Sequence, residues 1–393
     1  MLRFLTSGES HGKGLTGIIE GIPAGLTINS SYIDSHLKRR QAGYGRGGRM
    51  KIESDHAEIL SGVRHGLTTG APITLWIENK DWKNWQELMS VEPVIGEVKK
   101  VTRPRPGHAD LAGVLKYGHD DIRNVLERSS ARETAMRVAL GAVARRFLEE
   151  FNIKVGSYVL SIGGKGLSPD HAKVYWAQEE KLLELSKRAE LSEVRCPDEE
   201  ATAEIKRLID ETSKEGNSLG GVFEVFVAGV PPGLGSMIQW DRRLNARLSM
   251  AVSSIQAIKA VEIGAGILMA HSKGSQVMDE IFYSPERGYY RKSNFSGGIE
   301  GGISNGMPII LRAAMKPIPT LKKPLRSVDI LTHESLEAAY ERSDVCAVPS
   351  ASVIAEAMVS LVIADAFLEK FGGDNLKEVK ANYNSYISAL RER

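Results

Sequence analysis

SASVIAEAMVSLVIADAF, residues 350–367, decides the fold of this chain because it is apolar on nearly every side. Up to Ala364 it carries a single charged side chain, that of Glu356. A helix that is apolar nearly all round is buried on several sides. Two further stretches, Ala131–Phe147 and Leu244–Glu262, also lack a polar face of ordinary width. We therefore predict three helices in an inner layer, covered by sheets.

Alternating apolar residues mark the expected strands. The runs Val222–Val227 and Pro308–Ala313 alternate with the period of a half-buried strand. Strand, Pro-Gly turn and helix also follow one another twice, which predicts an α+β fold. The expected parts are the strands Gly17–Gly21 and Gly221–Ala228 and helices that begin near Ser31 and Asp241.

An internal repeat relates two parts of the chain. Shifting residues 8–26 by 208 positions aligns Gly8 with Gly216, Ser10 with Ser218, Gly12 with Gly220, Gly21 with Gly229, Pro23 with Pro231, Gly25 with Gly233 and Leu26 with Leu234. Residues 70–73 (GAPI) also resemble residues 306–309 (GMPI). We interpret the chain as a single domain, 1–393, whose halves, about 1–160 and 215–370, are related by a pseudo-two-fold. In this alignment Leu219 stands opposite His11, so the second half lacks the histidine. We therefore expect one composite site rather than two.

Two segments lie outside this repeat. Residues 168–216 are dense in Lys and Glu at helical spacing, and we interpret them as a solvated surface excursion without chemistry. The tail 372–393 has a similar composition and is expected to form a terminal helix at a subunit contact.

The composition is ordinary for a globular protein, with 42% apolar and 25% charged residues among 393. A net charge of +2 gives no case for wholesale nucleic-acid or membrane binding. Glu356 and Asp365 interrupt the most apolar stretch, which argues against a membrane span. Two cysteines and an N-terminus that turns polar within six residues fit a cytoplasmic protein.

Basic residues gather in residues 38–51, which hold Lys38, Arg39, Arg40, Arg46, Arg49 and Lys51 and no acid. One interpretation is a flexible RNA tether, and a nucleic-acid-binding protein is the alternative class of function. The preferred interpretation is a loop that binds phosphate or carboxylate, because arginine grips several anionic oxygens at once.

A second arginine-bearing run is ERSSARET, residues 127–134. Ser130 and Glu133 have the spacing of a capping box that opens a helix. The same helix start, flanked by Arg128 and Arg132, also offers an anion site. Neither interpretation excludes the other.

Ser10 and His11 lie in the glycine-bracketed run GESHG, residues 8–12. Small residues let backbone approach a ligand, and histidine carries a proton near neutral pH. Nucleotide hydrolysis is disfavoured, because the run is one residue short of a phosphate-binding P-loop and Gly14 replaces its Ser/Thr. A covalent serine enzyme is also disfavoured, since no partner motif follows. We predict a pocket for a polyanionic small molecule with proton transfer.

Three further segments are candidates. His108 follows two X-Pro units and is either structural or part of the site. Lys316–Thr320 is a stiff, extended loop, and Arg342 with Asp344 is either a surface ion pair or part of the site. No His, Cys or carboxylate spacing suggests a metal.

Taken together, these motifs resemble the chorismate synthase family, of the monofunctional type. The resemblance runs in order over nearly the whole chain, and Gln256 stands where some members have Asn. The segments that carry it are Gly8–Gly12, Arg40–Met50, Arg105–Leu111, Glu127–Ala135, Val230–Gly235, Gln256–Gly264, Gly297–Gly306, Lys316–Thr320 and Arg342–Pro349.

The resemblance implies a phosphate lyase of the shikimate pathway of aromatic amino acid biosynthesis. 5-enolpyruvylshikimate-3-phosphate would lose phosphate and a C6 hydrogen in a 1,4-anti elimination that gives chorismate. Reduced FMN would be needed without net redox change, as a transient electron donor. The resemblance also implies a helical core between two mainly antiparallel sheets, a β-α-α-β sandwich. It further implies a cytoplasmic homotetramer that receives reduced flavin from an external flavin reductase or another reduced-flavin supply.

The resemblance also implies roles for site residues. His11 would deliver a proton toward the flavin, His108 would assist at the departing phosphate, and Asp344 would take part in proton removal at flavin N5. Substrate anions would be held by Ser10, Arg49, Arg105, Ser130, Arg132 and Arg342. FMN would contact Arg128, Ser129, Ser130, Gln256, Ala257, Gly301, Lys316, Pro317, Ile318, Pro319, Thr320 and Arg342. Arg40 and Arg46 would belong to a closing loop that some members use for NADPH, a cofactor left open here.

Overall fold

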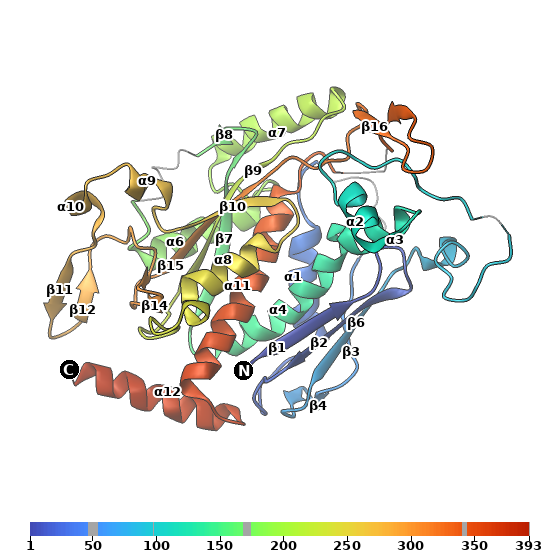
Figure 1. Cartoon of the computed structure of the whole chain (residues 1–393). Coiled ribbons are helices and arrows are strands. Elements are labelled where there is room, and N and C mark those ends of the chain that lie inside the picture. Colours follow the sequence, from blue (N-terminus) through green and yellow to red (C-terminus); the bar gives the residue numbers. More distant parts are fainter. Residues whose placement is uncertain (46–53, 97, 168–173, 340–343, 393) are drawn as a thin grey trace.

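The structure is a computed structural model that describes residues 1–45, 54–96, 98–167, 174–339 and 344–392. It mixes helices with two antiparallel sheets (Figure 1). The smaller sheet has the order β1-β2-β6-β3 and the larger β10-β15-β9-β7-β8. Their strands are β1 (Arg3–Ser7), β2 (Gly14–Glu20), β3 (Glu58–Ile59), β6 (Ile73–Glu78), β7 (Lys154–Ile162), β8 (Lys165–Gly166), β9 (Gly221–Ala228), β10 (Ile258–Ile263) and β15 (Ile309–Met315).

Helices account for most of the remaining regular structure. The longer ones are α1 (Ser30–Gln41), α2 (Asp110–Tyr117), α3 (Arg123–Ser129), α4 (Thr134–Glu149), α6 (Glu179–Leu191), α7 (Glu199–Lys214), α8 (Leu244–Ser253), α11 (Val348–Phe371) and α12 (Leu376–Arg391). Short helices are η2 (Trp82–Asn84), η3 (Ala131–Glu133), η4 (Trp240–Arg242), α9 (Ile267–Ala270) and α10 (Gly274–Val277). Short hairpins are β4 (Val63–Arg64) with β5 (Leu67–Thr68), β11 (Ile281–Ser284) with β12 (Gly288–Arg291), β13 (Ile299–Glu300) with β14 (Ile303–Ser304), and β16 (Arg326–Val328) with β17 (Ser335–Glu337).

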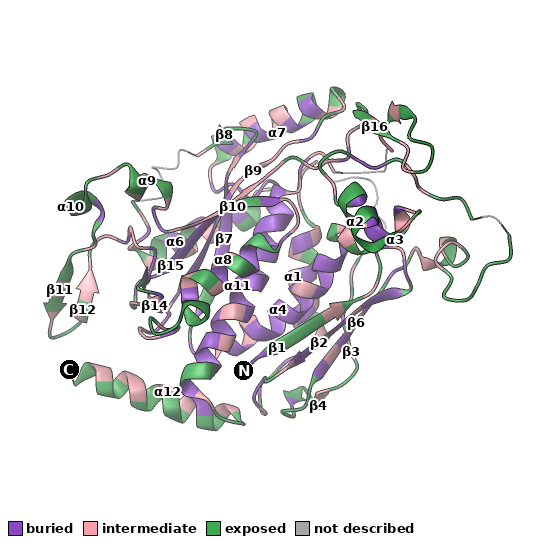
Figure 2. Cartoon of the chain, in the orientation of Figure 1, coloured by how far each residue is buried: buried purple, intermediate pink, exposed green. Residues whose placement is uncertain are grey.

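Helix α11 contains the stretch predicted to be buried, and it is buried along almost its whole length (Figure 2). It contacts β7 and β9 of the larger sheet as well as α1, α4 and α8. Helix α4 contacts β1, β2 and β6 of the smaller sheet. By length and hydropathy α11 matches a membrane span, but 89% of its most apolar window is buried inside the protein. Burial, more than its few charged residues, therefore identifies α11 as a core helix.

Helices α4 and α11 approach each other closely at Gly141. A Cβ atom added there would lie 2.4 Å from the Cβ of Ala357 on α11. Real Cβ atoms do not come so near, so only glycine fits this position without a shift of the backbone.

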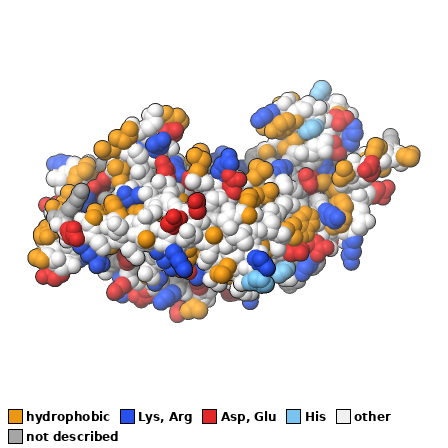
Figure 3. Space-filling view, turned by 90° about the horizontal axis from the view of Figure 1, so that it is seen from below, with side chains coloured by type: hydrophobic (Ala, Val, Ile, Leu, Met, Phe, Trp, Pro, Cys, Tyr) orange, Lys and Arg blue, Asp and Glu red, His pale blue; other side chains and the backbone are white. Residues whose placement is uncertain are grey.

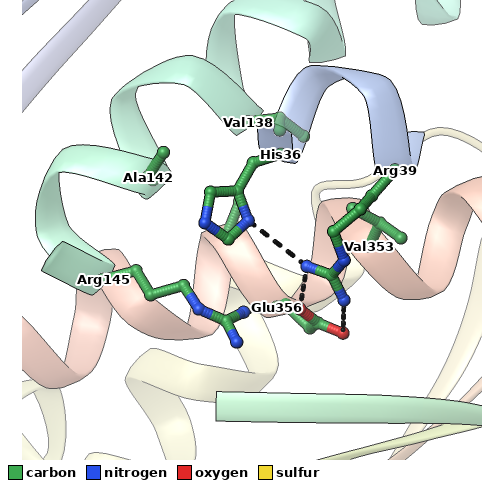
Figure 4. Close-up of a pocket in the computed structure, with 9 residues that line it drawn as sticks. His36, Arg39, Val138, Ala142, Arg145, Val353 and Glu356 are labelled. Carbon is green, nitrogen blue, oxygen red and sulfur yellow. Dashed lines mark hydrogen bonds and ion pairs between the residues drawn. The ribbon is translucent and has the colours of Figure 1, made fainter. Parts of the chain in front are cut away.

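A buried ionic network joins α1, α4 and α11 (Figure 4). Glu356 of α11 accepts hydrogen bonds from Arg39 at 2.8 Å, Arg145 at 2.6 Å and Arg195 at 3.2 Å. Burial would raise the pKa of this carboxyl, but the three guanidinium charges hold it well below its usual range. The charge of Glu356, the one acid between Ser350 and Ala364, is therefore balanced by arginines from elsewhere in the chain.

One predicted helix is wrong in its second half. Leu244–Glu262 was expected to be a single helix, but α8 ends at Ser253 and Ile258–Ile263 forms strand β10. Ala257 lies between the end of α8 and the start of β10, and its left-handed φ of 67° is incompatible with a continuous helix. The β-branched residues that follow pair with β15. By contrast, β9 spans the predicted Gly221–Ala228, and α1 begins one residue before Ser31.

The described part of residues 168–216 is helical, but it is not wholly solvated. Leu182 and Leu185 of α6 are buried in a cluster on the larger sheet, and Ile205 and Ile209 of α7 are buried in the main core. One face of each charged helix therefore covers apolar surface, while the other face carries the Lys and Glu residues. Seen from below, the surface shows acidic and basic side chains interspersed (Figure 3).

A turn recurs at the positions that the repeat aligns. In each half, a hydroxyl from a distant residue joins the carbonyl of a Pro to the amide of a Leu three residues later. The bonds are Thr68 Oγ1 to Pro23 O at 2.6 Å and Leu26 N to Thr68 Oγ1 at 2.9 Å, and Ser304 Oγ to Pro231 O at 2.7 Å and Leu234 N to Ser304 Oγ at 2.8 Å. The prolines and leucines of the two turns are 208 residues apart, whereas the hydroxyls that join them, those of Thr68 and Ser304, are 236 residues apart.

Candidate active site

His11 lies at the centre of the first group of site residues. Its Nδ1 lies 2.9 Å from Oε1 of Glu127, and its backbone N–H donates to Oε2 of the same carboxylate at 2.8 Å. Both side chains are largely buried, with 12% of His11 and 3% of Glu127 exposed. Burial would raise the pKa of Glu127, but the hydrogen bonds from His11 and the charge of Arg123 lower it below its usual value.

Trp85 and Arg123 complete the surroundings of this histidine. The ring of Trp85 lies 3.9 Å from that of His11, centroid to centroid, at an interplanar angle of 31°. Arg123 donates to Glu127 at 3.1 Å and lies over Trp85 at 5.2 Å. The imidazole is therefore held at one edge by a carboxylate and on one face by an aromatic ring.

Four serine and arginine candidates lie in the same two segments as His11 and Glu127. Ser130 Oγ donates to Ser10 Oγ at 3.1 Å, and Ser10 N donates to the carbonyl of Glu127 at 2.9 Å. Arg128 donates to the carbonyls of Thr6 and Gly8, so it secures the start of the GESHG loop. Ser129, at the end of α3, donates to the carbonyl of Leu126 at 3.5 Å.

Ser130 caps the following helix as predicted, accepting from the amide of Arg132 at 3.3 Å. The second half of the predicted capping box is absent from this part of the structure. Glu133 instead accepts from Gln256 at 2.9 Å and from Arg137 at 2.6 Å. The helix start is thus tied to the loop after α8.

Arg132 and Arg40 converge on a buried carboxylate. Arg132 donates to Asp55 at 2.7 Å and to Asn79 at 2.9 Å. Arg40 lies 3.8 Å from Asp55 and donates to Thr134 and to the carbonyl of Ala131. Asn79 in turn donates to the carbonyl of Gly12 at 2.7 Å, so the arginine pair and the GESHG loop form one unit.

His108 has the same kind of partner as His11. Its Nδ1 lies 2.5 Å from Oδ1 of Asp110, which is buried and also accepts from Arg105 at 2.8 Å. Burial would raise the pKa of Asp110, but the hydrogen bonds from His108 and Arg105 hold it well below its usual range. Arg105 also donates to Thr320 at 3.1 Å.

The Lys316–Thr320 loop joins the two histidine groups. Lys316 donates through its ammonium to the carbonyl of Gly107, next to His108, and through its amide to Ala257 O at 2.9 Å. Burial and the charge of Lys259 lower the pKa of Lys316. Since Gln256 bonds Glu133, a continuous series of contacts leads from the His11 group to the His108 group.

Two further candidates, Asp344 and Gly301, come from other loops. Asp344 precedes Val345, whose amide donates to the carbonyl of Gly45 at 3.0 Å and whose carbonyl accepts from Leu219 at 2.8 Å. Gly301 lies in the β13–β14 turn, which packs on the start of α8. Among the residues with described positions, no contact joins Gly301 to either histidine group. Arg46, Arg49 and Arg342 lie outside the described residues.

The sequence did not predict a role in the site for several residues, namely Asp55, Asn79, Trp85, Asp110, Arg123 and Glu127, and it assigned Glu133 only to a capping box. Two of them carried a signal. Glu127 stands next to Arg128 in the second arginine run, and Asp110 stands two residues after His108. For Asp55 and Asn79 the sequence holds no local sign, because their partners are distant in the chain.

Two histidines that each face a buried carboxylate, set among arginines and serines on a mixed helix–sheet fold, define an enzyme that moves protons on an anionic small molecule. Comparison with known proteins gives the family. The family model for chorismate synthase matches residues 2–368. A chorismate synthase of Aquifex aeolicus is 59% identical over 394 residues, covering 99% of this chain and 98% of that protein.

Further relatives agree. A chorismate synthase of Geotalea uraniireducens is 58% identical over 400 residues, with full coverage of both chains. A solved structure of chorismate synthase superimposes with a TM-score of 0.83 at 49% identity, covering 100% of this chain and 99% of that one. The chain therefore belongs to the chorismate synthase family, whose members are FMN-dependent lyases that form chorismate in the shikimate pathway.

Proposed function

We propose that this chain eliminates phosphate from 5-enolpyruvylshikimate-3-phosphate by a 1,4-anti elimination, giving chorismate with reduced FMN and no net redox change. The observation that carries the proposal is the pair of histidines, each on its own buried carboxylate, joined by one series of contacts through Gln256 and Lys316. An elimination of phosphate needs a proton near the leaving group and another controlled elsewhere in the site.

The residues present fit a flavin mononucleotide. Among the described residues, Gln256 Oε1 and Glu133 Oε2 are buried acceptors without a hydrogen-bond partner, and donor groups of a bound ligand would satisfy them. Arg128 and Lys316 supply positive charge for the phosphate. We infer that FMN is held by Arg128, Ser129, Ser130, Gln256, Ala257, Gly301, Lys316 to Thr320 and Arg342. Bound reduced FMN supplies transient electron donation that helps phosphate to leave.

The chain's own residues then handle protons and anions. His11 would hold and deliver a proton at its ring nitrogen, His108 would assist the departing phosphate, and Asp344 would take part in proton removal at flavin N5. We infer that Ser10, Arg49, Arg105, Ser130, Arg132 and Arg342 bind the substrate's two carboxylates and phosphate.

Arg105 and Arg132 are already paired with Asp110 and Asp55. Each carboxylate therefore fixes the guanidinium before the substrate arrives. Preorganised cations lose less entropy on binding than mobile ones, which suits a pocket for three anionic groups.

We further propose the finer architecture. Because α4 packs on the smaller sheet and α11 on the larger, and each helix packs on the other, a β-α-α-β sandwich of two pseudo-two-fold halves accounts for these contacts and for the recurring hydroxyl-bridged turn. The single domain, 1–393, would assemble as a cytoplasmic homotetramer, with reduced flavin supplied by a separate reductase. NADPH, if used, would bind at Arg40 and Arg46.

The test is a turnover assay under anaerobic conditions with 5-enolpyruvylshikimate-3-phosphate and dithionite-reduced FMN. Chorismate absorbance and phosphate release are followed together. We expect both products at equal rates with reduced flavin and neither with oxidised flavin. Phosphate without chorismate would instead indicate a phosphatase. A folded protein that shows no turnover but binds RNA with steep salt dependence, unaffected by FMN, would favour the nucleic-acid alternative.

A further inference from the structure

The carboxylate of Glu127 has three hydrogen-bond donors, and two of them belong to His11. The backbone N–H of His11 donates to one oxygen at 2.8 Å, and its ring Nδ1 faces the other at 2.9 Å. Arg123 donates to the second oxygen at 3.1 Å. With its main chain and its ring both bound to one rigid group, the imidazole has its rotation fixed.

An ionised carboxylate can only accept hydrogen bonds. The ring nitrogen that faces it must therefore carry the proton, so neutral His11 is the Nδ1–H tautomer with Nε2 left as the acceptor. The face of Trp85 at 3.9 Å holds the ring plane. His108 repeats the pattern, because its Nδ1 faces Asp110, which Arg105 also holds.

We propose that Glu127 is a positioning residue that fixes His11 in the Nδ1–H tautomer and directs Nε2 at the reacting groups. The inference rests on the proposed role of His11 in the elimination. Glu127 would touch neither substrate nor flavin, and it would act only through His11. A carboxylate behind a catalytic imidazole works in this way in serine hydrolases, where it orients the ring and stabilises its charged form.

The decisive variant is Glu127→Gln. Glutamine keeps the shape and can still accept from the His11 amide, but its NH2 group then faces the ring and favours the opposite tautomer. We expect turnover to fall by about 10²-fold, with the Kd for FMN and the KM for substrate changed by less than about twofold. The matched control is Glu150→Gln, since Glu150 also accepts from two basic side chains, Arg146 and Lys380, but lies just beyond the C-terminal end of α4 and has no contact with His11 among the described residues.

Two further measurements distinguish a positioning role of Glu127 from a purely structural one. In the His11→Ala background, adding Glu127→Gln should change turnover by less than about twofold, because a residue that acts only through His11 has nothing left to act on. In the wild-type protein labelled with nitrogen-15 at its nine histidines, the resonance lost in His11→Ala should show a protonated Nδ1 and an unprotonated Nε2 at neutral charge.

Normal turnover in Glu127→Gln, full additivity with His11→Ala, or an unprotonated Nδ1 would each overturn the proposal. If Glu127→Gln does not fold, the spectrum of the wild-type protein still decides it. If His11→Ala turns over normally, the catalytic role of His11 fails, and the tautomer measurement then reports separately on the Glu127 contact. A wild-type protein without turnover would contradict the proposed function and leave the tautomer test intact.

Discussion

His11 is the proposed proton donor, and a single substitution tests that role. We expect His11→Ala to bind FMN normally and to lose turnover by about 10²- to 10⁴-fold, because an acid–base group contributes in that range. Flavin titration and the anaerobic turnover assay measure the two properties on the same preparation. Turnover within about twofold of the wild-type value would remove His11 from the proton-transfer role.

His36 gives the folded state a dependence on pH. Burial, together with the charges of Arg145 and Arg39, lowers the pKa of this imidazole to about 3 from 6.5. Between these two pH values the unfolded chain binds a proton that the folded chain does not. The free energy of unfolding therefore falls as the pH falls below 6.5, by at most about 1.4 kcal/mol per pH unit from this group.

We expect His36→Gln to flatten that dependence, because glutamine does not titrate and can still accept from Arg39. Urea unfolding of both proteins at a series of pH values from 7 to 4 measures the slopes, whose expected difference follows from the linkage of protons to folding. His271→Gln, at an exposed position, is the control and should keep the wild-type slope. Equal slopes in wild-type protein and His36→Gln would contradict the burial argument.

The role of a residue could be predicted from the sequence only where its hydrogen-bond partners lie nearby in the chain. The glycine frame of His11 and the serine that caps at Ser130 could both be predicted. The carboxylate behind His11 could not, because Glu127 is 116 residues away and nothing in GESHG selects it. The arginine partners of Glu356 come from three different elements, so the sequence showed only that one acid stood in an apolar helix.

Among the secondary-structure elements, the α4–α11 contact depends on one missing methyl group. In most helices Gly→Ala stabilises, but at Gly141 the new Cβ would lie 2.4 Å from Ala357. We expect Gly141→Ala to lower the free energy of unfolding by about 1–3 kcal/mol, as overpacking does. Chemical denaturation measures the change. Gly274→Ala, where a Cβ meets nothing within 4 Å, should be neutral or slightly stabilising, and an equal loss at both positions would contradict the steric cause.

Elements with an unambiguous apolar pattern were predicted well, and short apolar runs were not. Helix α11 and strand β9 follow their patterns closely. Ile258–Ile263 continues the apolar spacing of α8, so periodicity alone assigns it to the helix. The strand is distinguished from the helix by its pairing with β15, about fifty residues later in the chain, together with the left-handed φ of Ala257.

For the whole molecule, the proposed homotetramer can be measured directly. Sedimentation equilibrium should give four times the chain mass of 43.0 kDa, and the mass should not change with FMN. Deleting residues 376–391, which form α12, should lower the oligomeric state if this terminal helix is the predicted subunit contact. An unchanged tetramer after that deletion would place the contact elsewhere, and a monomeric full chain would contradict assembly itself.

The long buried helix also sets an order of events during synthesis. The first amide of the smaller sheet, Leu2 N–H, donates to Asp365 at 2.6 Å, and α11 supplies core surface to both halves. Contacts between residues so far apart are slow to form, and apolar surface exposed in the meantime favours aggregation. Until residue 371 has been synthesised, α4 and the larger sheet lack the helix that packs on both of them. Completion of this core is therefore a late event in folding, and chaperones would meet a protein whose α4 and larger sheet still expose apolar surface.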